Sequence, residues 1–234
     1  MRAMANHLYL AGYQVVSLSY RGCSGEINRS KITYHAGKYD DLEQVLRWVQ
    51  MKMNPETLHL VGFSLGASIT LNFLIHSELQ HMIRSAVAIS PPLKLGLISD
   101  QLQSGIKSVY QTYFLRSLRE KNLRKRIQFP DYPLFTGHTL RDFDDQVTSV
   151  VHGFESAEHY YETCSTGSGL HQIECPVQII HAENDPICPL PIHEIQSTSN
   201  PKLEWSISKG GGHVAFLTLP DGWLGKEVVN FLKK

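Results

Sequence analysis

The chain has 234 residues, of which 42% are hydrophobic and 19% charged, and this composition is typical of a globular protein with a sizeable core. Its 22 basic residues balance 22 acidic ones, so charge gives no reason to expect nucleic acid or an anionic membrane as a partner. No apolar run reaches the roughly 18 residues that a membrane-spanning helix needs, and no Cys/His spacing is typical of a zinc site.

Strands and helices are expected to alternate along the first ninety residues. Residues 14–20, QVVSLSY, are β-branched and apolar, which predicts a buried strand. A polar loop with three glycines follows, and apolar spacing over 39–53 then predicts a helix. The apolar run 57–63 predicts the next strand, 65–77 a helix that starts directly after it, and 85–90 a third strand closed by two prolines.

Residues 91–170 differ from the preceding part of the chain, because they contain helical stretches and no convincing strand. Strand patterns return at 176–182 and 203–208, and a last helix is expected over 222–234. Alternating strands and helices on both sides of an all-helical insert predict an α/β fold. We expect a mostly parallel sheet with helices on both faces and a helical cap.

This pattern divides the chain into three parts. Residues 1–90 are expected to form the first part of the core, residues 91–170 the cap, and residues 171–234 the rest of the core. The basic run LREKNLRKR, residues 118–126, lies within the cap and has two interpretations. It could contact an anionic partner, but a solvated helix face is the more common origin of such a run and is the interpretation that we favour.

The four cysteines are scattered along the chain and form neither a CxxC pair nor a dense framework: Cys23, Cys164, Cys175 and Cys188. The first residues, MRAMANHLYLAGYQ, contain no long apolar run and no cleavage pattern of a signal peptide. Together these features predict a reduced, cytoplasmic protein.

The segment HLVGFSLGAS, residues 59–68, places Gly-X-Ser-X-Gly between a strand and a helix, which is the pattern of a nucleophile elbow. In such an elbow the backbone of Ser64 is strained, so that its hydroxyl stands clear of the sheet. Gly62 and Gly66 must be small because the strand and the helix approach closely there. The N–H of Leu65, at the helix N-terminus, is expected to point at the position where a carbonyl oxygen would become negative.

Other interpretations of this motif are weaker. A glycine-rich turn with a surface serine would not require the apolar strand before the motif or the amphipathic helix after it. A phosphate-binding P-loop needs a lysine after its second glycine, and none is present. The spacing from Gly62 to Gly66 also differs from the dinucleotide-binding GxGxxG pattern.

A nucleophilic serine needs a histidine as base and a carboxylate to orient that histidine, and after an elbow they follow in the order acid, then histidine. Asp185 ends the fourth strand region, with Glu183 as the alternative acid, and His213 follows three glycines after the fifth strand. Asp185 could instead be a turn residue before proline, and His213 an ordinary loop residue. His181 lies within a strand and is interpreted as structural.

These motifs give the sequence a resemblance to a known family. GFSLGAS, HAENDPICP and GGGHVAF resemble the α/β-hydrolase superfamily, and SYRGCSGEINRSKITYHAGKYDDL with LRDFDDQVTSVVHGFESAEHYYE resembles its YheT-like branch of predicted esterases and lipases. The resemblance implies a triad of Ser64, Asp185 and His213. It also implies medium-chain or lipid-like ester substrates and no cofactor or metal. Aromatic cap residues could line an acyl pocket or belong to the core: Tyr110, Tyr113, Phe114, Tyr160 and Tyr161.

The sequence departs from the family at its N-terminal side. The resemblance implies an additional strand, located before residues 14–20 and ending in a His-Gly loop. In members of the branch that loop supplies a second oxyanion donor. Here residues 1–13 resemble the helix that follows that loop, which implies an N-terminally truncated chain with N-terminal strands missing. Two expectations follow: a serine hydrolase of carboxylic esters, or a truncated and catalytically impaired hydrolase-fold protein that acts as a binding module or is a non-functional product.

Overall fold

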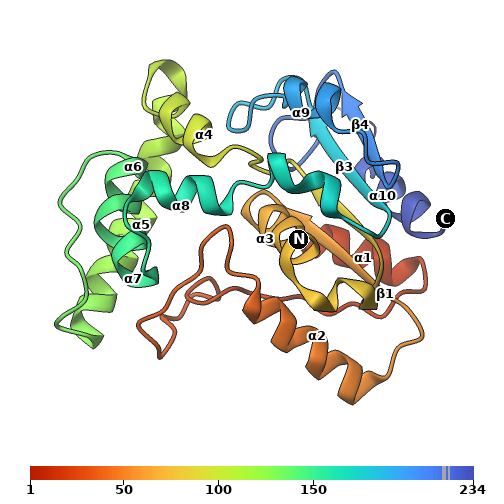
Figure 1. Ribbon diagram of the computed structural model, residues 1–234, viewed down its shortest axis with the longest axis horizontal. Helices are drawn as coiled ribbons and strands as arrows, with labels where there is room; N and C mark the ends of the chain where they lie inside the picture. Colours follow the sequence, from red (N-terminus) through yellow and green to blue (C-terminus); the bar gives the residue numbers. More distant parts are fainter. Residues whose placement is uncertain (218–219, 221) are drawn as a thin grey trace. The chain divides into compact units, whose positions relative to one another are not determined.

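The computed structural model describes residues 1–217, 220 and 222–234, apart from the side chain of residue 106, and divides the chain into two compact units. We call the first the core unit; it comprises Met1–Leu18, Tyr39–Leu93 and Thr166–Lys234. We call the second the helical unit; it comprises Ser19–Lys38 and Lys94–Ser165. Figure 1 labels the helices and strands of both units.

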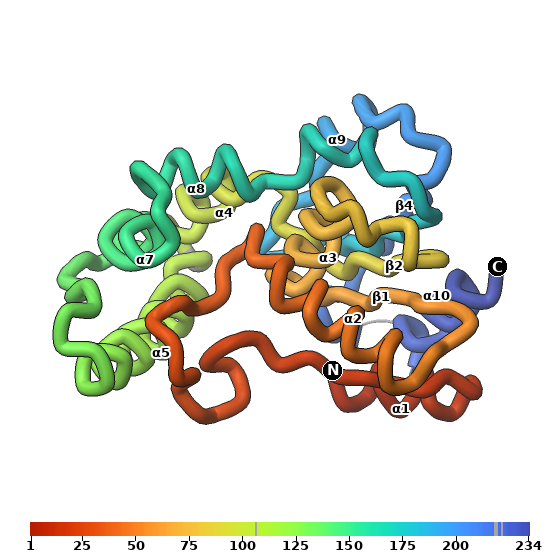
Figure 2. The backbone as a smooth tube through the Cα atoms, turned by 60° about the horizontal axis from the view of Figure 1, so that its bottom comes forward, coloured from red at the N-terminus to blue at the C-terminus, as the bar shows by residue number. Residues whose placement is uncertain are grey.

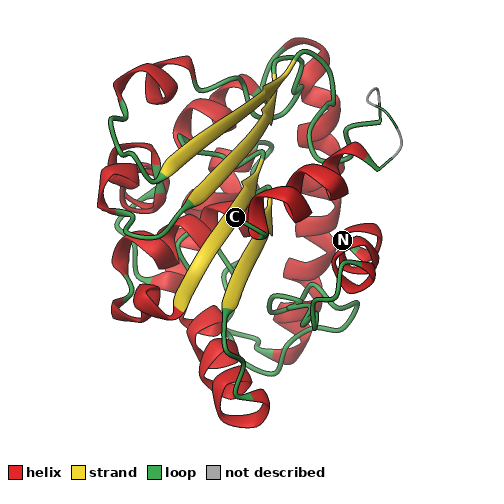
Figure 3. Cartoon of the chain, turned by 90° about the vertical axis from the view of Figure 1, so that its right-hand side faces the viewer, coloured by secondary structure: helices red, strands yellow, loops and turns green. Residues whose placement is uncertain are grey.

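The core unit is built on a four-stranded sheet in which all strands run parallel (Figure 3). The strands lie in the order β1 (Leu58–Phe63), β2 (Ile83–Ile89), β3 (Val177–Ala182) and β4 (Leu203–Ser208). Each coincides with a predicted strand to within two residues at either end. Pairing of Phe63 with Ile89 and of Ile89 with Ile180 brings the carboxyl ends of β1, β2 and β3 to one edge. The predicted α/β class with a parallel sheet is confirmed.

Helices cover both faces of this sheet: α2 (Asp40–Met53) and α3 (Leu65–His76) on one, α1 (Arg2–Leu10) and α10 (Trp223–Leu232) on the other (Figures 2 and 3). Successive residues of a strand point to opposite faces, so Ala86 and Ala88 of β2 pack in one core cluster while Val87 and Ile89 pack in the other. A strand buried on both faces needs this continuous apolar run. The short elements η1 (Glu78–Met82), η4 (Gly167–Gln172) and α9 (Ile192–Ser197) complete the unit.

The predicted strand over residues 14–20 is wrong, because this segment has an irregular conformation. Val15 and Val16 are 37% and 46% exposed, although Leu18 packs against the cluster formed with α2 and α3. An extended segment becomes a strand only where a neighbour exchanges hydrogen bonds with it. No strand among the described residues pairs with this segment, and β1 pairs with β2 on one side only. The local β propensity of residues 14–20 is therefore not sufficient to form a strand without a pairing partner.

The helical unit consists of α4 (Leu95–Gln101), η2 (Gly105–Lys107), α5 (Ser108–Gln128), α6 (Leu140–Phe143), η3 (Asp144–Ser149), α7 (Val150–His152) and α8 (Ala157–Cys164). The element η3 is a π-helical turn between α6 and α7. Within the described residues of this unit there is no strand, in agreement with the helical character predicted for 91–170. Over the described parts of the whole chain, no helix combines the length and the apolar character needed to cross a membrane.

The loop at residues 19–38 also belongs to the helical unit, where α5 anchors it. The ammonium group of Lys125 donates hydrogen bonds to the carbonyl oxygens of Asn28, at 2.8 Å, and of Ser30. Lys125 is only 2% exposed, so the interpretation of residues 118–126 as a solvated face is wrong at this position. Its neighbour in the run, Arg124, is exposed as expected. Carbonyl oxygens satisfy the buried cation, which a count of charges along the sequence does not reveal.

Candidate active site

Ser64 occupies the sharp turn between β1 and α3, with φ +50° and ψ −122°. Positive φ is rare for a residue with a side chain and marks local backbone strain. The turn is fixed from both sides, because the N–H of Ser64 donates to the carbonyl oxygen of Ile89 at 2.8 Å and its carbonyl accepts from Ala67 at 2.9 Å. Ser64, the serine of the predicted elbow, is therefore held by the sheet and by the first turn of the helix.

Gly62 lies where β1 and α3 approach most closely. A Cβ atom at this position would lie 2.6 Å from the carbonyl oxygen of Gly66 and 2.7 Å from the Cα of Ala67. Both are backbone atoms and cannot move aside. Residue 65 begins α3. Because the first N–H groups of a helix have no acceptor within the helix, the N–H of Leu65 is a donor available to a negative oxygen beside Ser64.

The carboxyl group of Asp185 is held in the turn that follows β3. Its Oδ1 accepts hydrogen bonds from the main-chain N–H groups of Ile187 at 2.8 Å and Cys188 at 2.9 Å. Its Oδ2 accepts from the Nδ1 of His213 at 2.8 Å, and the Asp185 side chain is fully buried. Glu183, the alternative acid, is exposed. Asp185 is therefore the residue that the fold brings to His213.

His213 connects this carboxylate to the serine. Its Nδ1 faces Asp185, and its Nε2 lies 2.7 Å from the Oγ of Ser64. A carboxylate at Nδ1 favours the tautomer that carries the proton there, which leaves the Nε2 lone pair free to accept from the serine hydroxyl. The loop bends through Gly212, with φ +68°, whose N–H donates to the side chain of Asn184 at 3.0 Å. The three predicted residues thus form one hydrogen-bonded chain.

Ser90 supports this arrangement and was not anticipated from the sequence. It directly follows β2 with φ +49°, is fully buried, and its hydroxyl donates to the carbonyl oxygen of His213. Its N–H donates to the carbonyl oxygen of Ile180 at 2.8 Å. The only hint in the sequence is its position between a strand and two prolines, which predicts the end of the strand but not a contact with residue 213.

His181 has the structural position that the sequence predicted. Its side chain is fully buried in β3, with Nε2 2.9 Å from the carbonyl oxygen of Cys188 and 3.8 Å from the Oδ2 of Asp185. The hydrogen bond to Cys188 closes the turn that carries Asp185. Burial lowers the pKa of His181, so that its neutral form is favoured.

The aromatic residues predicted for an acyl pocket have different positions within the helical unit. Tyr160 and Tyr161 are buried, and the hydroxyl of Tyr161 lies 2.8 Å from the Oδ2 of Asp144. Tyr113 is 73% exposed on α5, while Tyr110 and Phe114 are partly buried. At least two of the five residues therefore take part in the packing of their own unit.

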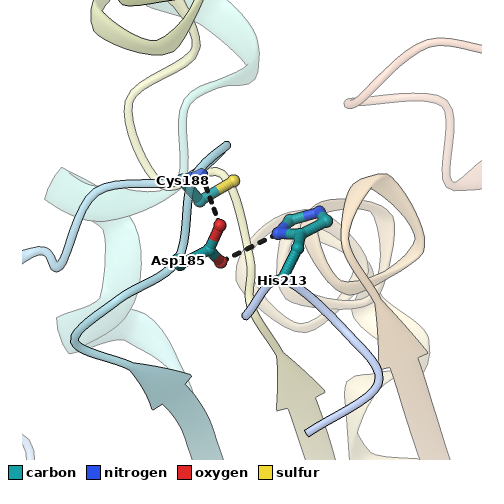
Figure 4. Close-up of side chains that lie close together, drawn as sticks. All are labelled: Asp185, Cys188 and His213. Carbon is teal, nitrogen blue, oxygen red and sulfur yellow. Dashed lines mark hydrogen bonds and ion pairs between the residues drawn. The ribbon is translucent and has the colours of Figure 1, made fainter. Parts of the chain in front are cut away.

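One set of three side chains among the described residues could hold a metal ion: Asp185, Cys188 and His213. Figure 4 shows them together at the carboxyl end of β3. Two of the three already form the acid–histidine pair, so the set overlaps the site described above. Ester hydrolysis through a serine needs no metal, and the hydrogen bonds around Asp185 account for its position without one.

Comparison with known proteins identifies the family of this chain. Residues 1–220 match the family model of the alpha/beta hydrolase fold. The candidate esterase YheT of Escherichia coli (strain K12) is 32% identical over 231 residues, which cover 94% of this chain and 68% of that protein. A monoacylglycerol lipase of Saccharomyces cerevisiae is 27% identical over 94% of this chain, and the chain spans 52% of its length.

The solved structures agree on the fold. The esterase Pf2001 of Pyrococcus furiosus superposes with a TM-score of 0.63 at 19% identity, over 100% of this chain and 75% of that one. At this level of identity the superposition shows the fold alone, whereas the sequence match to YheT also indicates the branch of the family. The chain belongs to the α/β-hydrolase fold family, in the branch that contains YheT.

Proposed function

We propose that this protein is a serine hydrolase that cleaves carboxylic esters through an acyl-serine intermediate. The observation that carries the proposal is the chain of hydrogen bonds from Ser64 through His213 to Asp185, with distances of 2.7 and 2.8 Å. The class of ester hydrolase is supported by the relatives, which carry the names esterase and monoacylglycerol lipase.

In the first half of the reaction Ser64 Oγ attacks the ester carbonyl carbon while its proton passes to Nε2 of His213. The carbonyl oxygen becomes negative and is stabilised by the N–H of Leu65 and the dipole of α3. Collapse of this intermediate breaks the carbon–oxygen bond, and the leaving alcohol takes the proton from His213. Ser64 is then esterified.

In the second half a water molecule gives its proton to His213 and attacks the acyl-serine, which releases the acid and restores the serine hydroxyl. Asp185 orients the imidazole in both halves and stabilises its cation when Nε2 is protonated. Because Asp185 is itself fixed by two main-chain N–H groups, it can hold the ring without changing its own position.

We further propose medium-chain or lipid-like acyl esters as substrates and residues 91–170 as the cap that selects them. Support comes from the name of the yeast relative and from the aromatic residues of the cap. Water is the second substrate, and no cofactor is required. A reducing, cytoplasmic setting is part of the same proposal, with support from the four cysteines, which are scattered along the sequence without a CxxC pair.

The nucleophile is tested with a fluorophosphonate, which reacts covalently with activated serines. Ser64 should be labelled in the intact chain, and Ser64→Ala should remove the label. The matched control is Ser68→Ala, which changes another serine of the same motif region, lies in α3 and is buried. Equal labelling of the Ser64→Ala variant would refute the assignment of the nucleophile. A series of chromogenic esters with increasing acyl length then tests the substrate class.

A further inference from the structure

The side chain of Cys188 has no task in the proposed hydrolysis, yet it lies beside the two residues that activate the serine (Figure 4). A carboxylate oxygen of Asp185, the sulfur of Cys188 and a ring nitrogen of His213 all lie within 4.8 Å of one another. The main-chain N–H of Cys188 already donates to Asp185 at 2.9 Å, so the position of the thiol is tied to that of the acid.

These three donor types suit a thiophilic divalent cation. Zn²⁺ binds thiolate sulfur at about 2.3 Å and nitrogen or oxygen at about 2.0–2.2 Å, which places two ligands of a tetrahedral ion roughly 3.3–3.6 Å apart. The longest separation in the set, at most 4.8 Å, must shorten by about 1.5 Å, and the Asp185–His213 pair, at 2.8 Å, must open by about 0.5 Å. Thiolate sulfur also disfavours Mg²⁺ and Ca²⁺.

The ion would reach the set from the side of His213. The side chain of His213 is 12% exposed, whereas that of Asp185 is fully buried and Cys188 is 2% exposed. With three protein ligands, a fourth position on the ion remains for water. The set therefore has the number of protein ligands that zinc has at catalytic sites, and His213 is its most exposed member.

We propose that Asp185, Cys188 and His213 form an inhibitory site for a thiophilic divalent cation such as Zn²⁺. Binding at Nδ1 releases the thiol proton of Cys188 to solvent, and the single N–H proton of His213 is transferred from Nδ1 to Nε2 by exchange with water. The imidazole then carries its proton on Nε2, the atom that faces Ser64, and cannot accept the serine proton. Binding does not depend on the proposed function, but the inhibition does.

Binding is tested with Co²⁺ as a spectroscopic probe on the purified full chain. A thiolate ligand gives a charge-transfer band that carboxylate and imidazole ligands do not give. The band should appear in the wild type and in Ser64→Ala, and it should be absent from Cys188→Ser. The matched control is Cys175→Ser, a buried cysteine of the same unit that lies outside the set, and it should keep the band. Absence of the band from the wild type would overturn the proposal.

Inhibition is tested by adding Zn²⁺ to the esterase assay, with each variant compared with its own metal-free rate. Zn²⁺ should inhibit the wild type and Cys175→Ser, and a chelator should restore both rates. The half-inhibiting concentration should rise at least about 10-fold in Cys188→Ser, since even the loss of an outer-shell partner weakens metal sites 10–100-fold. Equal inhibition of Cys188→Ser would overturn the site.

Failure of the proposal and failure of the proposed function have different signatures. A chain without esterase activity that still shows the cobalt–thiolate band in Ser64→Ala would retain the metal site and lose the hydrolase assignment. An active chain without the band would retain the hydrolase and lose the metal site. If Cys188→Ser does not fold, as judged by its melting curve, Cys188→Ala replaces it in both assays.

Discussion

Each of the two units holds an aspartate by hydrogen bonds, Asp185 buried and Asp144 partly buried, and the two carboxyl groups are surrounded by different donors. In the core unit, Asp185 accepts two main-chain N–H groups and the imidazole N–H of His213. In the helical unit, Asp144 accepts the hydroxyl of Thr148 at 2.7 Å and that of Tyr161 at 2.8 Å. The first carboxyl group is held by backbone and a ring nitrogen, and the second by side-chain hydroxyls.

The consequence for Asp144 is a raised pKa of its carboxyl group. Burial raises the pKa of Asp144 from 3.8 to about 6, and the hydroxyls of Thr148 and Tyr161 together with the more distant Arg141 offset only part of that rise. Burial, and then the charge of Asp144, raise the pKa of the neighbouring Tyr160 and Tyr161. The comparison teaches that two hydroxyl donors are not enough to offset the effect of burial on the charged form of Asp144.

The largest effect is expected from breaking the core-unit arrangement with Asp185→Asn. An amide at this position can present its NH₂ group to Nδ1 of His213 and so favours the wrong tautomer of the ring. A change of this kind lowers kcat by about 10⁴-fold in a serine triad, and we expect a loss of that order here. Steady-state kinetics on a chromogenic ester give the measurement. The control is Glu183→Gln, on the exposed alternative acid; a larger loss in that variant would exchange the two roles.

The second effect concerns the charge of Asp144. Its pKa is about 6 in the folded chain and 3.8 as a free side chain, so the folded state binds the proton more tightly. The contribution of this group to stability is fully present below pH 3.8 and is lost as the pH rises through about 6. At pH 8 the charge on Asp144 lowers the free energy of unfolding by up to about 3 kcal/mol, since its pKa is about 6 and not 3.8.

Asp144→Asn should remove this pH dependence. The variant should be more stable than the wild type at pH 8 by up to about 3 kcal/mol, and the difference should disappear near pH 4. Urea unfolding at a series of pH values measures the difference, because other titrating groups act equally in both proteins. A variant that is less stable than the wild type at pH 8 would show that the hydroxyl donors support the charge better than we argue.

A smaller effect sharpens the comparison by removing one hydroxyl donor. Tyr161→Phe should lower the free energy of unfolding by about 1.5 kcal/mol at pH 8, where Asp144 is charged, and by roughly 0.5 kcal/mol at pH 5. Tyr113→Phe, on a side chain that is 73% exposed, is the matched control and should change stability at neither pH. Losses of equal size at pH 5 and pH 8 would mean that the Tyr161 hydroxyl does not respond to the charge.

The sequence predicts the elements around Ser64 well, because β1 and α3 carry their own local patterns. A short apolar run ended by Gly-X-Ser-X-Gly fixes the strand, the turn and the start of the helix within a few residues. The positions of Asp185 and His213 could be predicted for a related reason, since each follows the end of an apolar strand. Their roles in catalysis remain predictions that the variants above address.

The remaining features depend on contacts between residues far apart in the chain. Residues 14–20 have the composition of a strand. A segment forms a strand only where a neighbour pairs with it, and no described strand pairs with residues 14–20. The hydroxyl of Ser90 reaches the carbonyl oxygen of His213, and the ammonium group of Lys125 reaches that of Asn28. Neither contact follows from composition or period, because both are set by how separate segments meet in the folded chain.

The close approach at Gly62 separates what the motif says about ancestry from what it says about chemistry. A methyl group there would lie 2.6 Å from the carbonyl oxygen of Gly66, so larger residues are excluded whether or not the protein is an enzyme. A descendant that lost Ser64, and with it the reaction, would still have to inherit Gly62 to keep the helix on its strand. In any lineage of this chain the glycine therefore records the architecture, and under the proposed function the serine between the glycines records selection for catalysis.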